Sequence, residues 1–188
     1  MLNSNKFITD GLRAIAVGAI ILYHAKIPII NDRGDFTGGF IGIDIFFVIS
    51  GYLMTLIILN ELIETNNFSF KYFFERRIRR IIPPLIIVAL VTIPLAWMFL
   101  FPSYLLYLMN SIKNLFSFSS NFYFYYTGQL FGEISGLFKP LLHTWSISLL
   151  VQFYIIFPIF LLLSYKYFKK NLVFILIISF VISLVLAE

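Results

Sequence analysis

The sequence predicts an all-α membrane protein: a polytopic bundle of about five transmembrane helices plus one interfacial or re-entrant segment, in a single domain over residues 1–188. Of these residues, 60% are hydrophobic, whereas soluble domains contain about 45–50%. Only 12% are charged, which is about half of the usual share. A chain of this length cannot form a soluble core large enough for so many apolar side chains.

Five apolar segments supply the predicted spans, because each approaches the roughly 20 residues that cross a bilayer. They are residues 14–30, 36–59, 81–101, 143–165 and 172–187. The first contains His24 and Lys26, the second contains Asp44, and the other three carry no formal charge. A cleaved signal peptide is not expected, since polar groups interrupt the first segment and no small-residue cleavage site follows it.

Residues 104–126 are long enough to cross a membrane, but they contain Lys113 and several Asn and Ser. If they do not span and the N-terminus lies inside, ten of the fourteen basic residues lie on the cytoplasmic side, as the positive-inside rule favours. If they span, Lys166, Lys169 and Lys170 move outside. We therefore predict an interfacial or re-entrant element, and its nine aromatic side chains suit the headgroup region.

Composition also excludes several kinds of chemistry. The chain has no Cys and two His, so thiolate or His-rich metal sites are excluded and no metal is expected. It contains no Walker loop, dinucleotide motif, HExxH or Gly-x-Ser-x-Gly. The net charge of +5 lies mostly in clusters between apolar runs, so it predicts contact with membrane lipid rather than nucleic acid.

Arg13 and His24 are the first candidate catalytic residues, because ionisable groups inside a membrane usually serve a function. They are eleven positions apart, which places them on one helix face and about 16 Å apart along its axis. Arg13 would lie near the cytoplasmic end and His24 beyond the midplane. Alternatively, Arg13 reaches lipid phosphates and His24 makes a packing hydrogen bond.

Asp44 is the third candidate catalytic residue. It is expected one or two turns below the outer surface, at a depth comparable to that of His24. A carboxylate there would fix the imidazole tautomer and stabilise its cationic form. Alternatively, Asp44 stays near the outer headgroups or pairs with Lys26 or Arg33.

Two further groups of residues are candidates for binding. His143, Trp145 and Ser146 open the fourth span on the outer side, where they suit a polar substrate or, equally, an interfacial belt. Arg77 and Arg80 belong to a basic cluster before the third span, which serves as a topology anchor or as a clamp for phosphates of a cytosolic cofactor. Gly38 and Gly42 are four apart and indicate close helix packing.

Four stretches together resemble the membrane-bound acyltransferase 3 family, the integral O-acyltransferases of bacterial envelope glycans. They are DGLRAIA at residues 10–16 followed by Tyr23 and His24, GFIGIDIFFVISGYL at 39–53, FERRIRRIIP at 74–83, and PLLHTWSIS at 140–148 followed by QFY at 152–154. They occur in the family's order and cover residues from about 8 to 160.

The resemblance implies transfer of an acyl group, commonly acetyl from acetyl-CoA, to a sugar hydroxyl of a cell-envelope polysaccharide, lipopolysaccharide or lipid-linked glycan. It implies a location in the bacterial inner membrane. His24 would be the central catalytic residue, with Arg13 as its partner, while Arg77 and Arg80 would hold the phosphates of acyl-CoA. These roles agree with the chemistry, since an alcohol needs a base and a developing oxyanion or a phosphate needs a cation.

The sequence departs from the family pattern in two respects. Leu150 and Val151 stand where the family usually carries two Glu. The chain also covers only the N-terminal half of the family core, so we expect a truncated domain, with a second chain as a possible source of further helices.

Two alternatives stay open at this stage. One is a non-catalytic membrane subunit or degenerate remnant of the family. The other is a transporter in which His24 and Asp44 relay protons.

Overall fold

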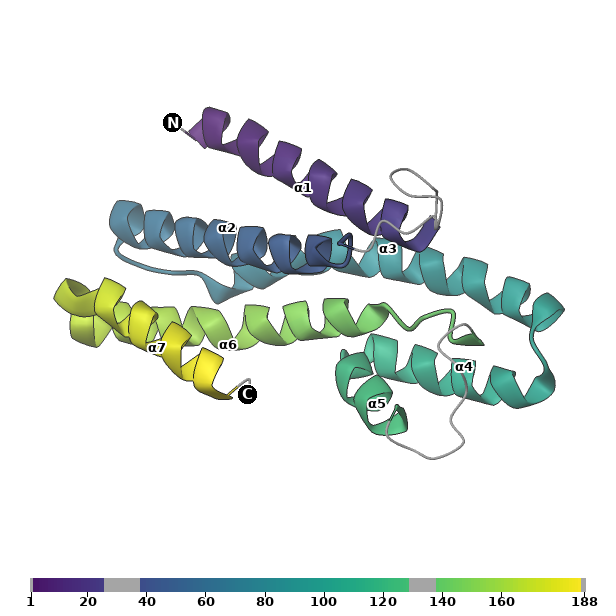
Figure 1. Cartoon of the computed structure of the whole chain (residues 1–188). Helices are drawn as coiled ribbons and strands as arrows, with labels where there is room; N and C mark the ends of the chain where they lie inside the picture. The colour runs from purple at the N-terminus through teal and green to yellow at the C-terminus, as the bar shows by residue number, and fades with distance from the viewer. Residues whose placement is uncertain (1, 26–37, 129–137, 187–188) are drawn as a thin grey trace. The chain divides into compact units, whose positions relative to one another are not determined.

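The computed structural model describes residues 2–25, 38–128 and 138–186, and side chains from residue 7 onward. These residues form seven α-helices and no strand (Figure 1), which confirms the all-α class. The helices are α1 (Leu2–Ala25), α2 (Ile41–Thr65), α3 (Phe70–Phe99), α4 (Pro102–Phe116), α5 (Ser120–Thr127), α6 (Thr144–Phe168) and α7 (Leu172–Leu186), with a short 3₁₀ helix, η2 (Lys169–Asn171), before α7. Lys26 and Arg33, the alternative ion-pair partners expected for Asp44, lie outside the described residues.

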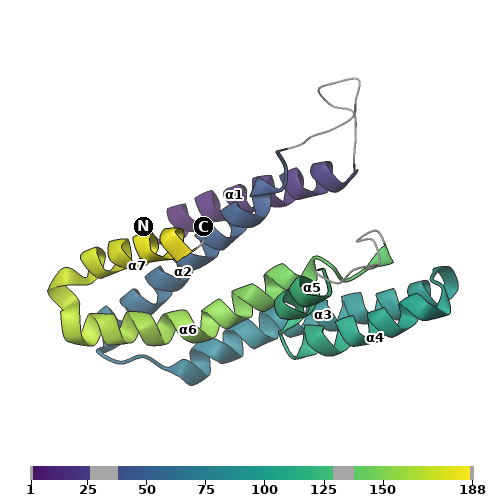
Figure 2. The ribbon, with the colours of Figure 1, turned by 60° about the horizontal axis from the view of Figure 1, so that its bottom comes forward.

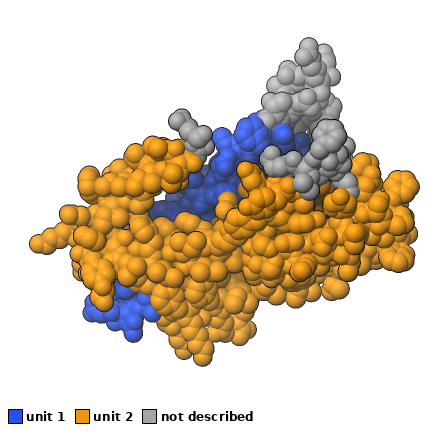
Figure 3. All heavy atoms as spheres, turned by 90° about the horizontal axis from the view of Figure 1, so that it is seen from below, with its two compact units in different colours: residues 1–68 blue, residues 69–188 orange. Residues whose placement is uncertain are grey.

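The chain forms two compact units, residues 1–68 and 69–188, which Figure 3 colours separately. The first contains α1 and α2, and the second contains α3 to α7. Each unit has its own internal packing and is described by itself.

Four stretches of the described residues are long and apolar enough to cross a membrane, as expected for the first four predicted spans. They are Phe7–Ala25, Ile41–Thr65, Phe70–Phe99 and Thr144–Leu186. The last stretch contains both α6 and α7, and Figures 1 and 2 show α7 folded back beside α6. With 15 residues, α7 is about 22 Å long, shorter than the roughly 30 Å of a hydrocarbon core.

The segment predicted to be interfacial or re-entrant is divided between two helices. Residues 104–126 fall in α4, which has 15 residues, and α5, which has 8. Between them, Phe118 adopts a left-handed conformation with φ of 52°, which ends α4. Neither helix is long enough to span alone, and the outer half of α3 packs against α4 through Leu85, Ala89, Leu108 and Leu115.

In the first unit, α1 and α2 pack closely at Gly42. A Cβ added there would meet the carbonyl oxygen of Ala16 and the side chain of Ile20, whereas one added at Gly38 would meet nothing within 4 Å. The expected close packing is therefore confirmed at Gly42. Gly38 takes no part in it.

Candidate functional site

Arg13 lies on the face of α1 that packs against α2. Thr9 and Ala16, one turn to either side, are buried. The Arg13 side chain is 17% exposed, lies 3.4 Å from the Asp10 carboxylate and stacks over the Phe46 ring of α2 at 5.8 Å. Its Nε is buried without a hydrogen-bond partner. A buried donor of this kind has lost its hydration without compensation.

His24 continues the same face one turn beyond Ile20. Its Nδ1 donates a hydrogen bond of 2.9 Å to the Ile20 carbonyl oxygen. A carbonyl can only accept, so Nδ1 carries the proton in this hydrogen bond. The Tyr23 ring meets the imidazole edge-on at 5.0 Å. Both contacts come from α1 and orient the His24 ring.

Arg13 and His24 are both in α1, and their separation of eleven positions corresponds to about 16 Å. This distance excludes direct contact. Their shared helix face is as expected, and the two groups act at different depths of one helix.

The structure does not bring Asp44 to His24. Tyr23 packs on Phe40 at 6.2 Å and Arg13 on Phe46 at 5.8 Å, so α1 and α2 are antiparallel and Asp44 is level with residues near Ala16. That level is about 12 Å from His24 along the helix. Asp44 is also exposed and lies about 200° around α2 from the buried Gly42. The His24 ring instead donates a hydrogen bond to the Ile20 carbonyl of its own helix.

In the second unit, the Tyr154 ring of α6 reaches Arg77, which belongs to the basic cluster near the start of α3. Its guanidinium carbon lies 5.3 Å from the Phe73 ring and 4.9 Å from the Tyr154 ring, and these two residues are only 1% and 7% exposed. Two aromatic faces hold a cation favourably. Its neighbours differ, since Arg79 forms an ion pair of 2.8 Å with Glu75 and Arg80 is exposed.

The contact between Arg77 and Tyr154 fixes the register of the start of α3 against α6. Along α6, Tyr154 is twelve residues from Lys166 and eleven from His143, which correspond to about 18 Å and 16 Å. Arg77 and His143 are thus separated along α6 by about half the thickness of a hydrocarbon core. The sequence placed them at opposite surfaces, but the outer half of α3 packs on α4, so α6 meets the start of α3 with its middle.

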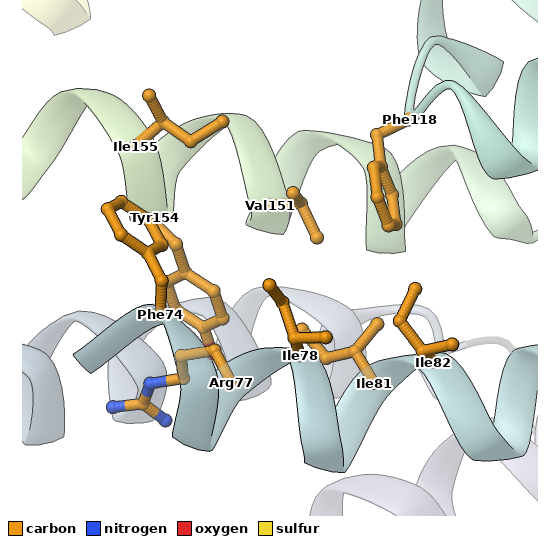
Figure 4. Close-up of a pocket in the computed structure, with 9 residues that line it drawn as sticks. All are labelled: Phe74, Arg77, Ile78, Ile81, Ile82, Phe118, Val151, Tyr154 and Ile155. Atoms are coloured by element: carbon orange, nitrogen blue, oxygen red, sulfur yellow. The ribbon is translucent and has the colours of Figure 1, made fainter. Parts of the chain in front are cut away.

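An apolar cavity of about 190 Å³ lies between these two helices (Figure 4). Val151 faces the cavity from α6, together with Tyr154. Ile78 and Ile81 face it from α3, and the Arg77 chain forms part of its wall. Val151 is one of the two positions where the resemblance predicts Glu, so this departure leaves an apolar side chain on the wall of the cavity that Arg77 also lines, whereas Leu150 is not among the lining residues.

Two of the polar side chains at the start of α6 form hydrogen bonds to backbone carbonyls three residues earlier in the chain. The Thr144 hydroxyl donates to the Leu141 carbonyl at 2.7 Å, and the Ser146 hydroxyl donates to the His143 carbonyl at 2.9 Å. The His143 side chain is exposed, and Trp145 is half-buried. Of the predicted binding group, His143 is therefore the most accessible member.

Sequence reasoning missed the residues that join α5 to α6. The amides of Asn121 and Gln152 exchange hydrogen bonds of 3.1 and 2.9 Å, and Gln152 also donates to the Phe118 carbonyl at 2.9 Å. The Ser120 backbone N–H donates to the Ser148 hydroxyl at 3.2 Å. The sequence signal available was a Gln within an apolar segment, and it did not identify a partner.

The helices and the Arg13–His24 face define an integral membrane protein with a titratable group held on a rigid transmembrane helix. The family model for the acyltransferase domain matches residues 8–187. The chain therefore belongs to the acyltransferase 3 family.

Three relatives are similar over most of this chain. A peptidoglycan O-acetyltransferase of Listeria monocytogenes is 38% identical over 89% of this chain and 26% of its own length. A putative peptidoglycan O-acetyltransferase of Bacillus subtilis is 38% identical over 86% of this chain and 24% of its own length. A putative O-acetyltransferase of Staphylococcus aureus is 37% identical over 86% and 26%. The chain thus spans about a quarter of the length of these relatives, and no solved structure matches it.

Proposed function

We propose that this protein is an integral-membrane O-acyltransferase that moves an acyl group, acetyl in the first instance, from acyl-CoA to a sugar hydroxyl of a cell-envelope glycan. The observation that carries the proposal is the hydrogen bond from His24 Nδ1 to the Ile20 carbonyl. With Nδ1–H bonded to the backbone, Nε2 is the nitrogen that would act as the base, on the helix face that also holds Arg13. The family assignment supplies the reaction class.

In the proposed reaction, His24 Nε2 takes the proton of the sugar hydroxyl as the oxygen attacks the thioester carbonyl carbon. The carbon–sulfur bond then breaks, and the imidazolium returns the proton to the departing CoA sulfur. Arg13 supplies positive charge on the same face and stabilises negative charge formed or bound there. Asp44 lies on the other face of α2, so the proposed reaction does not use its carboxylate as the partner of the His24 ring.

The donor and acceptor are assigned by chemistry. Arg77 and Arg80 lie at the basic start of α3 and supply the cations for the phosphates of acyl-CoA, with Arg80 as the exposed member. His143, Trp145 and Ser146 at the start of α6 would meet the glycan. Because two of the relatives are named for peptidoglycan, we propose a peptidoglycan sugar as the acceptor and the bacterial cytoplasmic membrane as the location.

A second candidate is a non-catalytic subunit or a degenerate remnant of the family, which acts only with a companion chain that provides further helices. The apolar Leu150 and Val151 favour it, because the resemblance places two carboxylates at these positions. Under this alternative the chain inserts stably and has no transfer activity by itself.

The test is a transfer assay on membranes that contain this chain and no related acyltransferase. Labelled acetyl-CoA is supplied, and label is counted in the peptidoglycan and lipid-linked sugar fractions. We expect label with the parent chain. His143→Ala retains the proposed base, His24, and should still give label, at a lower level than the parent chain. His24→Ala should reduce label to background while leaving the amount of inserted protein unchanged.

Two results would contradict the catalytic proposal. Label that persists in His24→Ala would remove His24 from the mechanism. Absence of label with stably inserted parent protein would favour the second candidate, and restored label upon co-expression of a partner chain would then identify a split enzyme.

A further inference from the structure

Phe118, one of the residues between α4 and α5, has an unusual backbone conformation. Phe118 has φ of 52°, a region that bulky side chains rarely occupy. Such strain persists when the surroundings determine it, and it often occurs at functional positions. Here the Phe118 carbonyl accepts a hydrogen bond from Gln152 Nε2 at 2.9 Å, and the Asn121–Gln152 amide pair fixes the start of α5 immediately beyond it.

The Phe118 ring occupies one end of the α3–α6 cavity. Figure 4 shows the ring entering the space between the helices beside Ile82, while Arg77 and Tyr154 lie at the opposite end. Val151 lies between the two ends. The cavity is lined by apolar surface, and a cavity of this kind and of about 150 Å³ can stay dry yet hold a group as large as benzene.

Arg77 and His143 lie at levels that are close together along α6. Arg77 is level with Tyr154, and His143 is about 16 Å further along α6. Phe118 and Val151 lie between these levels, as the contact of Gln152 with the Phe118 carbonyl and the position of Val151 in α6 require. A bilayer excludes charged groups over roughly 30 Å of hydrocarbon, which is about twice this separation.

We propose that Phe118 is the hydrophobic seal between the Arg77 end and the His143 end of this unit, and that Gln152 is its positioning residue. An apolar constriction of this kind blocks ions by excluding water. It leaves room beside Val151 for a small apolar group such as an acyl chain, while charged phosphates would lose too much hydration to follow. The connection to an acyl chain rests on the proposed function, but the seal itself does not.

The absence of Cys from the natural sequence allows a direct test on the full chain. Val151→Cys places one thiol on the cavity wall, and a charged, membrane-impermeant methanethiosulfonate is added on the His143 side of sealed vesicles. We expect no labelling above background in Val151→Cys. In the Phe118→Ala background, the same thiol should become labelled at a rate that approaches that of a His143→Cys reference.

Matched variants separate the seal from general disruption. Phe122→Ala removes an exposed ring of α5 and should leave Val151→Cys protected. Gln152→Leu keeps the Phe118 ring but removes its hydrogen bond, and it should expose the thiol as Phe118→Ala does. A His143→Cys thiol that still labels from one side only shows that each background is inserted in its normal orientation.

Two outcomes would overturn the proposal. One is labelling of Val151→Cys from the His143 side with Phe118 and Gln152 intact. The other is continued protection in both the Phe118→Ala and the Gln152→Leu backgrounds, so that misfolding of one variant alone does not decide the result. Since no step measures acyl transfer, a failed transfer assay would remove the proposed function and leave this test unaffected.

Discussion

The side-chain amides of Asn121 and Gln152 donate to each other's oxygens and join α5 to α6. Such a pair uses both functions of each amide, so no polar atom of this contact faces the membrane without a partner. The same Gln152 amide also donates a hydrogen bond to the carbonyl of Phe118, at the break between α4 and α5. One amide therefore determines where the α4–α5 connection meets the long helix.

The coupling between these amides is measurable. Asn121→Leu and Gln152→Leu should each destabilise the protein, and the double variant should lose less than the sum, because each single change leaves a partner amide unpaired. Coupling energies for intramembrane hydrogen bonds are about 0.6 kcal/mol, reaching about 1.7 kcal/mol. Reversible unfolding in mixed micelles gives the three free energies. Strict additivity would show that the pair contributes nothing to stability.

A second prediction concerns the contact between α1 and α2. Gly42→Ala should destabilise the first unit by about 1–3 kcal/mol, as overpacking commonly does, because the added methyl group would meet the Ala16 carbonyl oxygen. Gly38→Ala is the matched control, since its added methyl group meets open space. Thermal unfolding in detergent compares the two. An equal effect of both substitutions would disprove the contact.

A third prediction separates the ring of Tyr154 from its hydroxyl. Tyr154→Phe keeps an aromatic face over Arg77 and should leave the free energy of unfolding almost unchanged. Tyr154→Leu removes that face and should lower it by about 0.5–2 kcal/mol through the lost cation–π contact, in addition to altered packing. In an Arg77→Met background the difference between the two variants should shrink, as measured by the same unfolding experiment. A difference that does not depend on Arg77 would assign the effect to packing alone.

A fourth prediction addresses Val151, on the wall of the cavity that Arg77 also lines. Val151→Glu puts a carboxylate in the cavity, which is costly unless a cation pairs with it. We expect Val151→Glu to be tolerated in the parent protein but to reduce stability strongly in Arg77→Met. Val151→Gln, which has similar size and no charge, should not depend on residue 77. Equal losses in both backgrounds would show that the carboxylate and Arg77 do not meet.

The sequence was informative wherever a local pattern decides the structure. Hydrophobic length predicted the four long apolar stretches, because this signal depends on neighbouring residues alone. The distribution of basic residues over the chain predicted that residues 104–126 are not one spanning helix. The shared face of Arg13 and His24 followed from helical periodicity in the same way.

Contacts between distant segments could not be predicted in this manner. The register of α2 against α1 depends on where Gly42 allows the helices to approach, and it moved Asp44 away from the level of His24. The level of Arg77 along α6 depends on how α3 divides its contacts. One part of α3 packs against α4, and the part near Arg77 contacts α6. Asn121 and Gln152 are 31 residues apart, and no periodicity relates them.

The short separation between Arg77 and His143 has an electrical consequence. If water reaches both levels, the membrane potential falls across about 16 Å instead of about 30 Å, so the local field is about twice that of the surrounding bilayer. Moving one elementary charge through the full potential still involves about 2.3 kcal/mol per 100 mV, but the work is concentrated over a few side chains. Any charge displaced between these levels would therefore respond to membrane voltage more strongly, per ångström moved, than one displaced elsewhere in the bilayer.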